Sequence, residues 1–334
     1  MALFKKDPLQ IIDFRSYGTN SHFYARGRAL EDESIDLEAQ KILSLAINAF
    51  KRMESDEVKH VDVNIKLPNG RILKANTGKD GYFIVEENIE NLNALTNDEG
   101  WLSFELSYDD VNIKRKITND NKFPGELLIP SVEAEFGVAS DIDDTILHTG
   151  VVSTLKWRVI YNSIFKNAKS RLPLEGAAEF YHKLHRGASG ENANPIFYVS
   201  HSPWNLYRYL ELFLKQNNFP KGPILLRSLG NFLKKKSPDE KPQKQKEIIN
   251  LLMTYPELPF ILIGDSGEHD PDIYIEIAKA FPNRIKAIYL RSVKHKKRML
   301  RVKGLLEKYK TTPALLVESS EQAIVHAREN GFIV

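Results

Sequence analysis

Apolar and polar residues alternate in several short stretches of the first 130 residues. The alternating stretches are 22–28, 61–67, 71–75, 82–85, 101–106 and 111–117. A period of two residues is typical of strands with one buried face. The stretch 37–53 instead repeats apolar residues at helical spacing. Residues 1–130 are therefore predicted to form a mostly β, sandwich-like domain with one helix, and Pro124, Gly125 and Pro130 are interpreted as the junction that follows it.

From residue 131 onward, short apolar stretches alternate with amphipathic ones. The predicted strands are 136–140, 196–200, 224–227, 260–264, 285–290 and 314–317, and the predicted helices are 176–184, 204–216, 244–253, 272–280 and 321–330. Continuous apolar strands alternating with helices indicate a parallel sheet that is covered on both faces. Residues 131–334 are thus predicted to be an α/β domain, in which ligands bind beyond the carboxyl ends of the strands.

The composition is that of an ordinary globular protein. Of the 334 residues, 42% are hydrophobic and 27% charged, and cysteine is absent. The length favours two domains, and the lack of cysteine excludes disulfides, thiol catalysis and cysteine zinc sites. The first residues contain no apolar signal-peptide core, and no run of about 18 apolar residues occurs. These features predict a soluble, cytoplasmic protein.

Charge is distributed unevenly between the two predicted domains. Residues 1–130 hold 17 Lys+Arg and 22 Asp+Glu, a net charge of −5, and residues 131–334 hold 30 and 22, a net charge of +8. The basic domain suggests an anionic substrate or surface, although its lysines and arginines could equally serve only to solvate helices. The charge density does not reach that of nucleic-acid-binding proteins, so no nucleic acid is expected as a partner.

A cluster of acidic residues follows the first strand of the basic domain. The sequence DIDDT places Asp141, Asp143, Asp144 and Thr145 directly after the apolar stretch 136–140. Buried carboxylates must be paired or must bind a hard cation, because an unpaired buried charge is strongly unfavourable. An EF-hand calcium loop would need glycine at position 146 and glutamate at 152, where the chain has isoleucine and valine. The pattern D-x-D-x-T after a strand instead predicts phosphoryl transfer.

Three further segments place polar residues at or near strand ends. Ser200 closes the second strand, with Ser202 as a competing candidate, and Asp265 follows the strand 260–264, with Asp270 five residues later. A lysine is also expected, and Lys244 at the start of a helix is the preferred candidate. Lys241 and Lys246 lie close enough in sequence to remain alternatives.

The ordered set DxDxT, serine, lysine and GDxxxxD resembles the haloacid-dehalogenase-like phosphohydrolase superfamily. The segments SDIDDTI, FYVSHSPWNLY, GPILLR and LPFILIGDSGEHDPDIY resemble more closely the actin-patch-associated phosphatidate phosphatase family, as does IIDFRSYGTNSHFYARGRALED near the N-terminus. One departure is Gln243, where the family pattern leads us to expect histidine before the lysine. The resemblance implies a Rossmann-like phosphatase domain with little or no cap, because only about 50 residues separate Asp143 from the next strand.

The resemblance also implies roles for these residues. Asp141 would be the nucleophile that forms an aspartyl-phosphate, and Asp143 would act as general acid and then as general base. Ser200 and Lys244 would hold the phosphoryl oxygens, and Thr145 would orient the nucleophile loop.

A magnesium ion is the implied cofactor. Asp141, Asp143, Asp265 and Asp270 would form its site, since Mg²⁺ prefers oxygen ligands. His201 is accordingly interpreted as a substrate contact or a local orienting residue rather than a ligand.

The function that the resemblance implies is hydrolysis of phosphatidate to diacylglycerol and phosphate. The residue chemistry alone supports only a phosphomonoester. The alternatives are a phosphatase of a soluble metabolite or phosphoprotein, and a binding module without activity. Contact with an anionic membrane is a further possibility for the aromatic, basic stretch 155–168 and for the lysine runs 234–236 and 294–301, which could instead pack on the sheet or form solvated turns. The N-terminal domain is expected to recruit a protein partner or a membrane.

Overall fold

A computed structural model describes most of the chain. The described residues are 7–32, 57–109, 113, 115–142, 176–227, 241–267, 269–293 and 295–334. The chain divides into two compact units, Met1–Ser131 and Val132–Val334. The predicted helix at 37–53 lies outside the described residues. No helix in the described ranges is long and apolar enough to span a membrane.

The first unit is mostly β, as predicted. Its strands are β1 (Leu9–Asp13), β2 (Ser16–Tyr17), β3 (His22–Glu31), β4 (Asp62–Lys66), β5 (Ile72–Asn76), β6 (Tyr82–Asn88), β7 (Trp101–Tyr108) and β8 (Phe123–Leu128), with short 3-10 turns η1 (Leu92–Leu95) and η3 (Asn119–Asn121). They form two sheets with the orders β1-β3-β6 and β2-β8-β7-β4-β5. Neighbouring strands pair antiparallel, apart from β2, which pairs parallel with β8.

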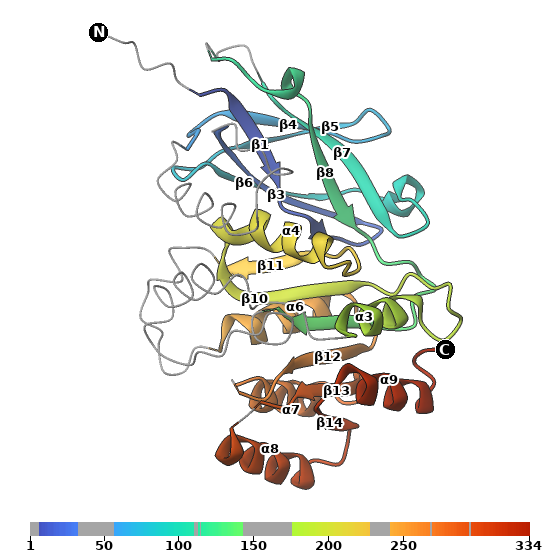
Figure 1. Ribbon diagram of the computed structural model, residues 1–334. Coiled ribbons are helices and arrows are strands. Elements are labelled where there is room, and N and C mark those ends of the chain that lie inside the picture. The colour runs from blue at the N-terminus through green and yellow to red at the C-terminus, as the bar shows by residue number, and fades with distance from the viewer. Residues whose placement is uncertain are drawn as a thin grey trace. The chain divides into compact units, whose positions relative to one another are not determined.

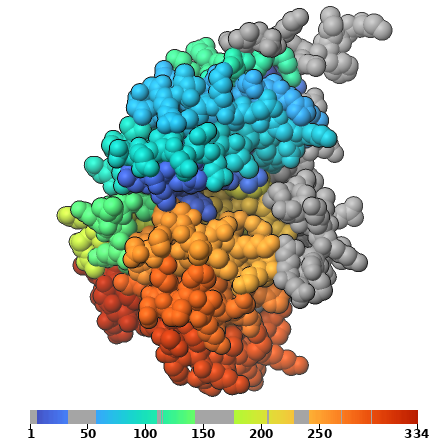
Figure 2. Space-filling view, turned by 180° about the vertical axis from the view of Figure 1, so that it is seen from behind, coloured from blue at the N-terminus to red at the C-terminus, as the bar shows by residue number. Residues whose placement is uncertain are grey.

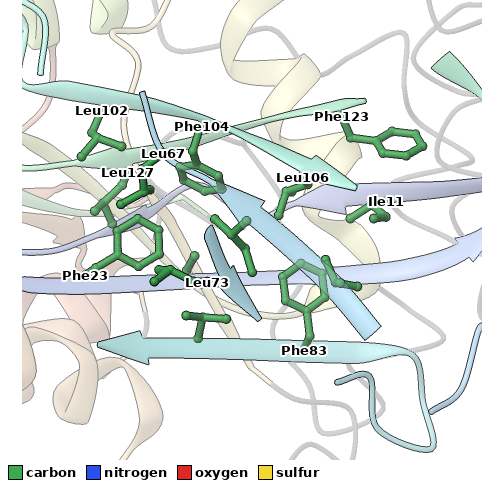
Figure 3. Packing of buried hydrophobic residues seen from close by; sticks show 14 of the residues in the cluster. Ile11, Phe23, Leu67, Leu73, Phe83, Leu102, Phe104, Leu106, Phe123 and Leu127 are labelled. Carbon is green, nitrogen blue, oxygen red and sulfur yellow. The ribbon is translucent and has the colours of Figure 1, made fainter. Parts of the chain in front are cut away.

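Side chains from both sheets form one apolar core (Figure 3). The rings of Phe23 on β3 and Phe104 on β7 meet edge to face, with centroids 5.5 Å apart. Gly125 on β8 lies beneath the Phe104 ring, and a Cβ at this position would overlap that ring. The position requires glycine because the aromatic ring occupies the space of a side chain.

Two expectations for the first unit need correction. Pro124 and Gly125 were expected at a domain junction but lie inside β8, where Pro124 is paired with Glu105 and Gly125 with Phe104. Of the predicted strand at 111–117, the described residues contribute only an isolated bridge between Ile117 and Leu9. Glycine is tolerated in β8 because the Phe104 ring packs on it. Pro124 lies outside the part of β8 that pairs with β2, which is Leu127–Leu128.

The second unit has the α/β architecture that was predicted, with a parallel sheet (Figure 1). Its strands are β9 (Gly137–Asp141), β10 (Ile196–Pro203), β11 (Ile224–Arg227), β12 (Phe260–Asp265), β13 (Ile285–Arg291) and β14 (Ala314–Val317). Its helices are α3 (Ala177–Arg186), α4 (Tyr207–Gln216), α6 (Gln243–Thr254), α7 (Asp270–Ala280), α8 (Lys296–Lys308) and α9 (Ser320–Glu329), with a 3-10 turn η5 (Trp204–Leu206) before α4. Helices α3 and α9 contact each other, as do α6 and α7.

The order in which strands are added to the sheet reverses at the middle of the sheet. In the described part of the unit the order is β11-β10-β9-β12-β13-β14, and every neighbouring pair is parallel. The chain proceeds from β9 outward to β11 and then returns to β12 on the other side of β9. This reversal point, at the carboxyl ends of β9 and β12, is where ligands bind in open α/β sheets.

Helix α8 was not predicted, and the stretch 294–301 was considered a possible solvated turn. The structure shows a helix from Lys296 to Lys308, in which the side chain of Val302 is fully buried. Met299 and Leu306 lie on the same side of the helix as Val302, at spacings of three and four residues. The many lysines and arginines between these apolar residues conceal the helical period in the sequence.

Candidate active site

The strand register brings two predicted aspartates to the reversal point. Asp141 is the last residue of β9 and Asp265 the last residue of β12. These strands are neighbours, with Ser140 paired with Ile263, so both aspartates leave the sheet at the same edge. Both are buried. An apolar strand that ends in a buried carboxylate places that group where a ligand can reach it.

Lys244 joins this edge from α6. It is the second residue of the helix, and its side chain is fully buried. Its Nζ lies 3.0 Å from Asp141 Oδ1 and 2.5 Å from Asp270 Oδ1. Of the alternatives, Lys241 is exposed and pairs with Glu276 at 3.5 Å. Among the three candidate lysines, Lys244 is therefore the one that the structure places between two of the predicted aspartates.

Asp270 closes a short loop at the same edge. It is the first residue of α7, and its Oδ2 accepts a hydrogen bond of 3.1 Å from the backbone N–H of Asp265. The Gly267 N–H donates to Asp265 Oδ1 at 2.5 Å. A Cβ at Gly264 would overlap Asp270 Oδ2 and the ring of Tyr274, so the close approach of α7 to β12 requires glycine there.

Burial and the opposite charges act together on the ionisation of this cluster. Burial alone would lower the pKa of Lys244, but the carboxylates of Asp141 and Asp270 reverse this and hold the pKa well above its usual value. Burial raises the pKa of Asp270 to about 7, with Lys244 opposing the rise and Asp141 adding to it. One ammonium group is shared by two carboxylates, so the metal-free cluster favours retention of a proton.

A divalent cation fits the charge of this edge. Asp141, Asp265 and Asp270 supply only oxygen donors, and Lys244 compensates one of their three negative charges when all are ionised. A hard divalent cation would balance the remainder. Within the described ranges, no group of three or more His, Asp or Glu is already arranged as a metal site. Asp143, the fourth predicted ligand, lies outside the described residues.

Ser200 lies on the strand next to Asp141. Val199 of β10 is paired with Asp141 of β9, so Ser200 is one residue beyond this pair. Its Oγ accepts a hydrogen bond of 2.9 Å from the Ser202 N–H. The expectation that the strand ends at Ser200 is wrong, since β10 continues to Pro203. Both serines are buried on β10, and half-buried His201 lies between them.

Several residues predicted from the sequence lie outside the part of the chain that the structure describes. Asp143, Thr145 and the helical stretch 155–168 lie outside the described residues, as does the lysine run 234–236. The structure thus brings together Asp141, Lys244, Asp265 and Asp270, and places Ser200 on the neighbouring strand.

Two tyrosines at this edge were not identified from the sequence. Tyr274 on α7 is fully buried, donates a hydrogen bond of 3.0 Å to the Ile263 carbonyl, and has its pKa raised by burial. It follows Asp270 by four residues, which puts both on one side of α7. That spacing is the signal that could have identified it. Tyr181 on α3 lies with its hydroxyl 2.5 Å from Ser140 Oγ, directly before Asp141.

Comparisons with known proteins point to one family. Residues 136–292 match the family model described as the catalytic domain of phosphatidate phosphatase APP1. Phosphatidate phosphatase APP1 of Saccharomyces cerevisiae is 39% identical over 156 residues, which cover 46% of this chain and 25% of that protein. An uncharacterized protein of Schizosaccharomyces pombe is 28% identical over 222 residues, covering 65% of this chain and 34% of the relative.

The chain therefore spans between a quarter and a third of the length of these relatives. The matched residues 136–292 include every described residue of the aspartate–lysine cluster. The family resemblance noted in the motifs is confirmed, since residues 136–292 match the model of the phosphatidate phosphatase APP1 catalytic domain.

Proposed function

We propose that the second unit is a magnesium-dependent phosphatase that releases phosphate from phosphatidate. The observation that carries the proposal is the contact of Lys244 with both Asp141 and Asp270 at the reversal point of a parallel sheet. The cluster lies within residues 136–292, which match the model of the phosphatidate phosphatase APP1 catalytic domain. The strand order and the order of the motifs along the chain also support a haloacid-dehalogenase-like fold for this unit.

In the proposed reaction, an Asp141 carboxylate oxygen attacks phosphorus and the bond from phosphorus to the ester oxygen breaks. Asp143 donates a proton to the leaving glycerol oxygen, as its place two residues after the nucleophile suggests. Water then attacks the phosphorus of the aspartyl-phosphate, and Asp143 takes up the proton of that water. Phosphate leaves, and Asp141 and Asp143 return to their first states.

Lys244 has two tasks in this scheme. Its buried ammonium lies 3.0 Å from Asp141 Oδ1, where it would orient the carboxylate for attack. The same ammonium offers a donor to the phosphoryl oxygens as charge moves onto them. Ser200, on the neighbouring strand, would contribute a hydroxyl to these oxygens.

The proposed cation is held by carboxylates from several elements. Asp141 of β9 and Asp265 of β12 would be ligands, Asp270 of α7 a ligand or a partner that orients Asp265, and Asp143 the further ligand suggested by the sequence. When bound, Mg²⁺ would neutralise charge on the phosphate so that an anionic nucleophile can approach it. The excess of carboxylates over lysines in the cluster supports this assignment.

Phosphate release from two substrates tests the proposal. Wild type is compared with Asp141→Asn on phosphatidate in mixed micelles and on a soluble aryl phosphate, with Mg²⁺ or with EDTA. Loss of the nucleophile should reduce kcat on the order of 10⁴-fold or more on both substrates. Asp98→Asn, a substitution of an exposed aspartate in the first unit, is the control and should leave turnover unchanged.

The outcomes separate the alternatives. Activity on the aryl ester without activity on phosphatidate would replace the lipid substrate with a soluble one. Full activity in EDTA would contradict the proposed dependence on a metal ion. Full activity of Asp141→Asn would contradict the assignment of Asp141 as the nucleophile. A wild-type protein that hydrolyses neither ester would support a binding module instead.

A further inference from the structure

Helix α8 carries an exposed basic face. We define this face by the residues that lie opposite buried Val302 and are exposed to solvent, which are Lys296, Lys297, Leu300, Lys303, Glu307 and Lys308. Leu300 is 62% exposed in the middle of this set. In the described part of the chain, Lys296, Lys297 and Lys303 have no carboxylate partner within ion-pair distance. The face thus combines uncompensated positive charge with an exposed apolar side chain.

The charges at the start of α8 oppose the helix dipole. Lys296, Lys297 and Arg298 occupy the first turn, which contains no acidic residue. The amino end of a helix already carries partial positive charge, so cations there are locally unfavourable. Violations of such local rules tend to occur where a protein has a functional reason for them. The dipole and the lysines together make this end of α8 strongly electropositive.

The basic end of α8 lies at the same edge as the aspartate–lysine cluster. Strand β13 ends at Arg291, which is paired with Asp265 of β12, and α8 begins five residues later. The Arg298 guanidinium donates a hydrogen bond to the Gly267 carbonyl, in the loop between Asp265 and Asp270. Arg301 holds both carboxylate oxygens of Asp272 at 2.9 and 3.0 Å. These contacts fasten α8 directly to the loop and helix that carry two of the candidate site residues.

We propose that the exposed basic face of α8 binds the surface of a bilayer that contains anionic lipid, and so holds the candidate active site against that surface. Charge complementarity favours anionic headgroups, and Leu300 adds an apolar group that can enter the interface. In Figure 2 this part of the chain, coloured orange-red, forms open surface at the bottom of the view. The proposal adds a binding surface to the proposed function, and the binding itself requires no turnover.

Vesicle binding of the full chain tests this inference. Binding is measured by cosedimentation in EDTA with phosphatidylcholine vesicles, with and without phosphatidylserine, which is not a phosphomonoester and so is not a substrate analogue for the catalytic site. Wild type should bind only the vesicles with phosphatidylserine, and the binding should weaken as salt rises. Because each lysine near an anionic surface contributes roughly fivefold, Lys296→Gln/Lys297→Gln should bind about 25-fold more weakly.

A matched control separates the face from overall charge. Lys279→Gln/Arg328→Gln removes two exposed cations from α7 and α9 of the same unit and should bind like wild type. The α8 variant should fold normally, because removing cations from the first turn favours the helix dipole. Leu300→Ser should weaken binding by a smaller factor, while Asp141→Asn should bind fully even if it has no activity.

Three results would overturn the proposal. The first is equal loss of binding in the α8 and control variants, which would indicate only a general effect of charge. The second is binding that does not depend on phosphatidylserine. The third is capture of polyglutamate by the same face without any binding to vesicles, which would indicate an acidic protein as the partner. Because binding is measured without substrate, failure of the phosphatase proposal leaves this result interpretable.

Discussion

The two units bury charge in different ways. In the first unit, buried Arg28 lies 3.4 Å from Glu57 and over the ring of Tyr82 at 4.9 Å, and buried Glu31 accepts from Arg115. Each carboxylate of these pairs thus meets at least one cation, and Glu57 also meets Lys59 at 3.5 Å. In the described cluster of the second unit, by contrast, one lysine meets two carboxylates and a third lies beside them.

The excess of buried carboxylates makes the second unit the better candidate for binding a cation or another ligand. Balanced buried pairs are satisfied within the fold and serve its structure. An excess of buried carboxylate lowers stability unless protons or cations compensate it, which is the trade-off expected at a functional site. On this basis we propose that the first unit serves as a scaffold or recruitment domain and that the second carries the chemistry.

Removal of the central cation should produce the largest effect. Lys244→Met leaves the buried carboxylates of Asp141 and Asp270 facing each other, and loss of one partner from a buried ion pair typically costs about 3–5 kcal/mol. The free energy of unfolding, measured in urea with EDTA, should fall by that amount, and phosphatase activity should be lost. Lys241→Met, at an exposed lysine, is the control and should change neither quantity measurably. Retained stability in Lys244→Met would show that the cluster is not held by this lysine.

Glycine-to-alanine substitutions at one close contact in each unit should affect stability alike but activity differently. Gly125→Ala in the first unit overlaps the Phe104 ring, and Gly264→Ala in the second overlaps Asp270 Oδ2 and Tyr274. Overpacking typically costs about 1–3 kcal/mol, so both variants should unfold more readily. Only Gly264→Ala should also reduce kcat on a soluble aryl phosphate, since it displaces α7 from β12. Equal losses of kcat would contradict the division of labour between the units.

A further expected effect is a pH dependence specific to the second unit. Burial raises the pKa of Asp270 from its ordinary value of 3.8 to about 7, so the folded state keeps a proton that the unfolded state releases between these values. The contribution of this group to stability is therefore fully present below pH 3.8 and is lost as pH rises through about 7.

Urea unfolding in EDTA at several pH values checks this sign. The stability of wild type relative to Asp270→Asn should decrease as the pH rises from 4 toward 7. The decrease should end near pH 7, because the pKa of Asp270 in the folded protein is about 7. A difference that increases with pH would mean that Lys244 keeps Asp270 ionised in the folded protein.

The sequence predicted the sheet of the second unit well because its strands are buried on both faces and read as continuous apolar stretches. Strands β11 and β14 were predicted with the bounds that the structure shows, and the others within a few residues. Strands β1, β2 and the proline-containing β8 of the first unit were missed, because their positions depend on cross-strand partners far away in sequence. Helix α8 was missed because its basic residues outnumber the apolar ones that define its buried side.

The candidate site was predictable in its aspartates, whereas its lysine was predicted only as a preference for Lys244 over Lys241 and Lys246. Asp141 and Asp265 follow apolar strands, and this pattern is local in sequence. The choice among Lys241, Lys244 and Lys246 depends on where α6 begins and which side faces the sheet, and neither is fixed by composition. The same holds for Ser200 and Ser202, since the extension of β10 to Pro203 is determined by pairing with neighbouring strands.

The hydrogen bond from the Asp265 N–H to Asp270 Oδ2 has a consequence for how this motif can vary. This bond closes residues 265–270 into a ring of fixed size. The ring starts at the last residue of β12 and ends at the first residue of α7. Within such a ring, length is constrained more tightly than the identity of most intervening side chains. Insertion or deletion of a single residue between positions 265 and 270 should therefore be tolerated far less than substitution at position 269, whose side chain is exposed.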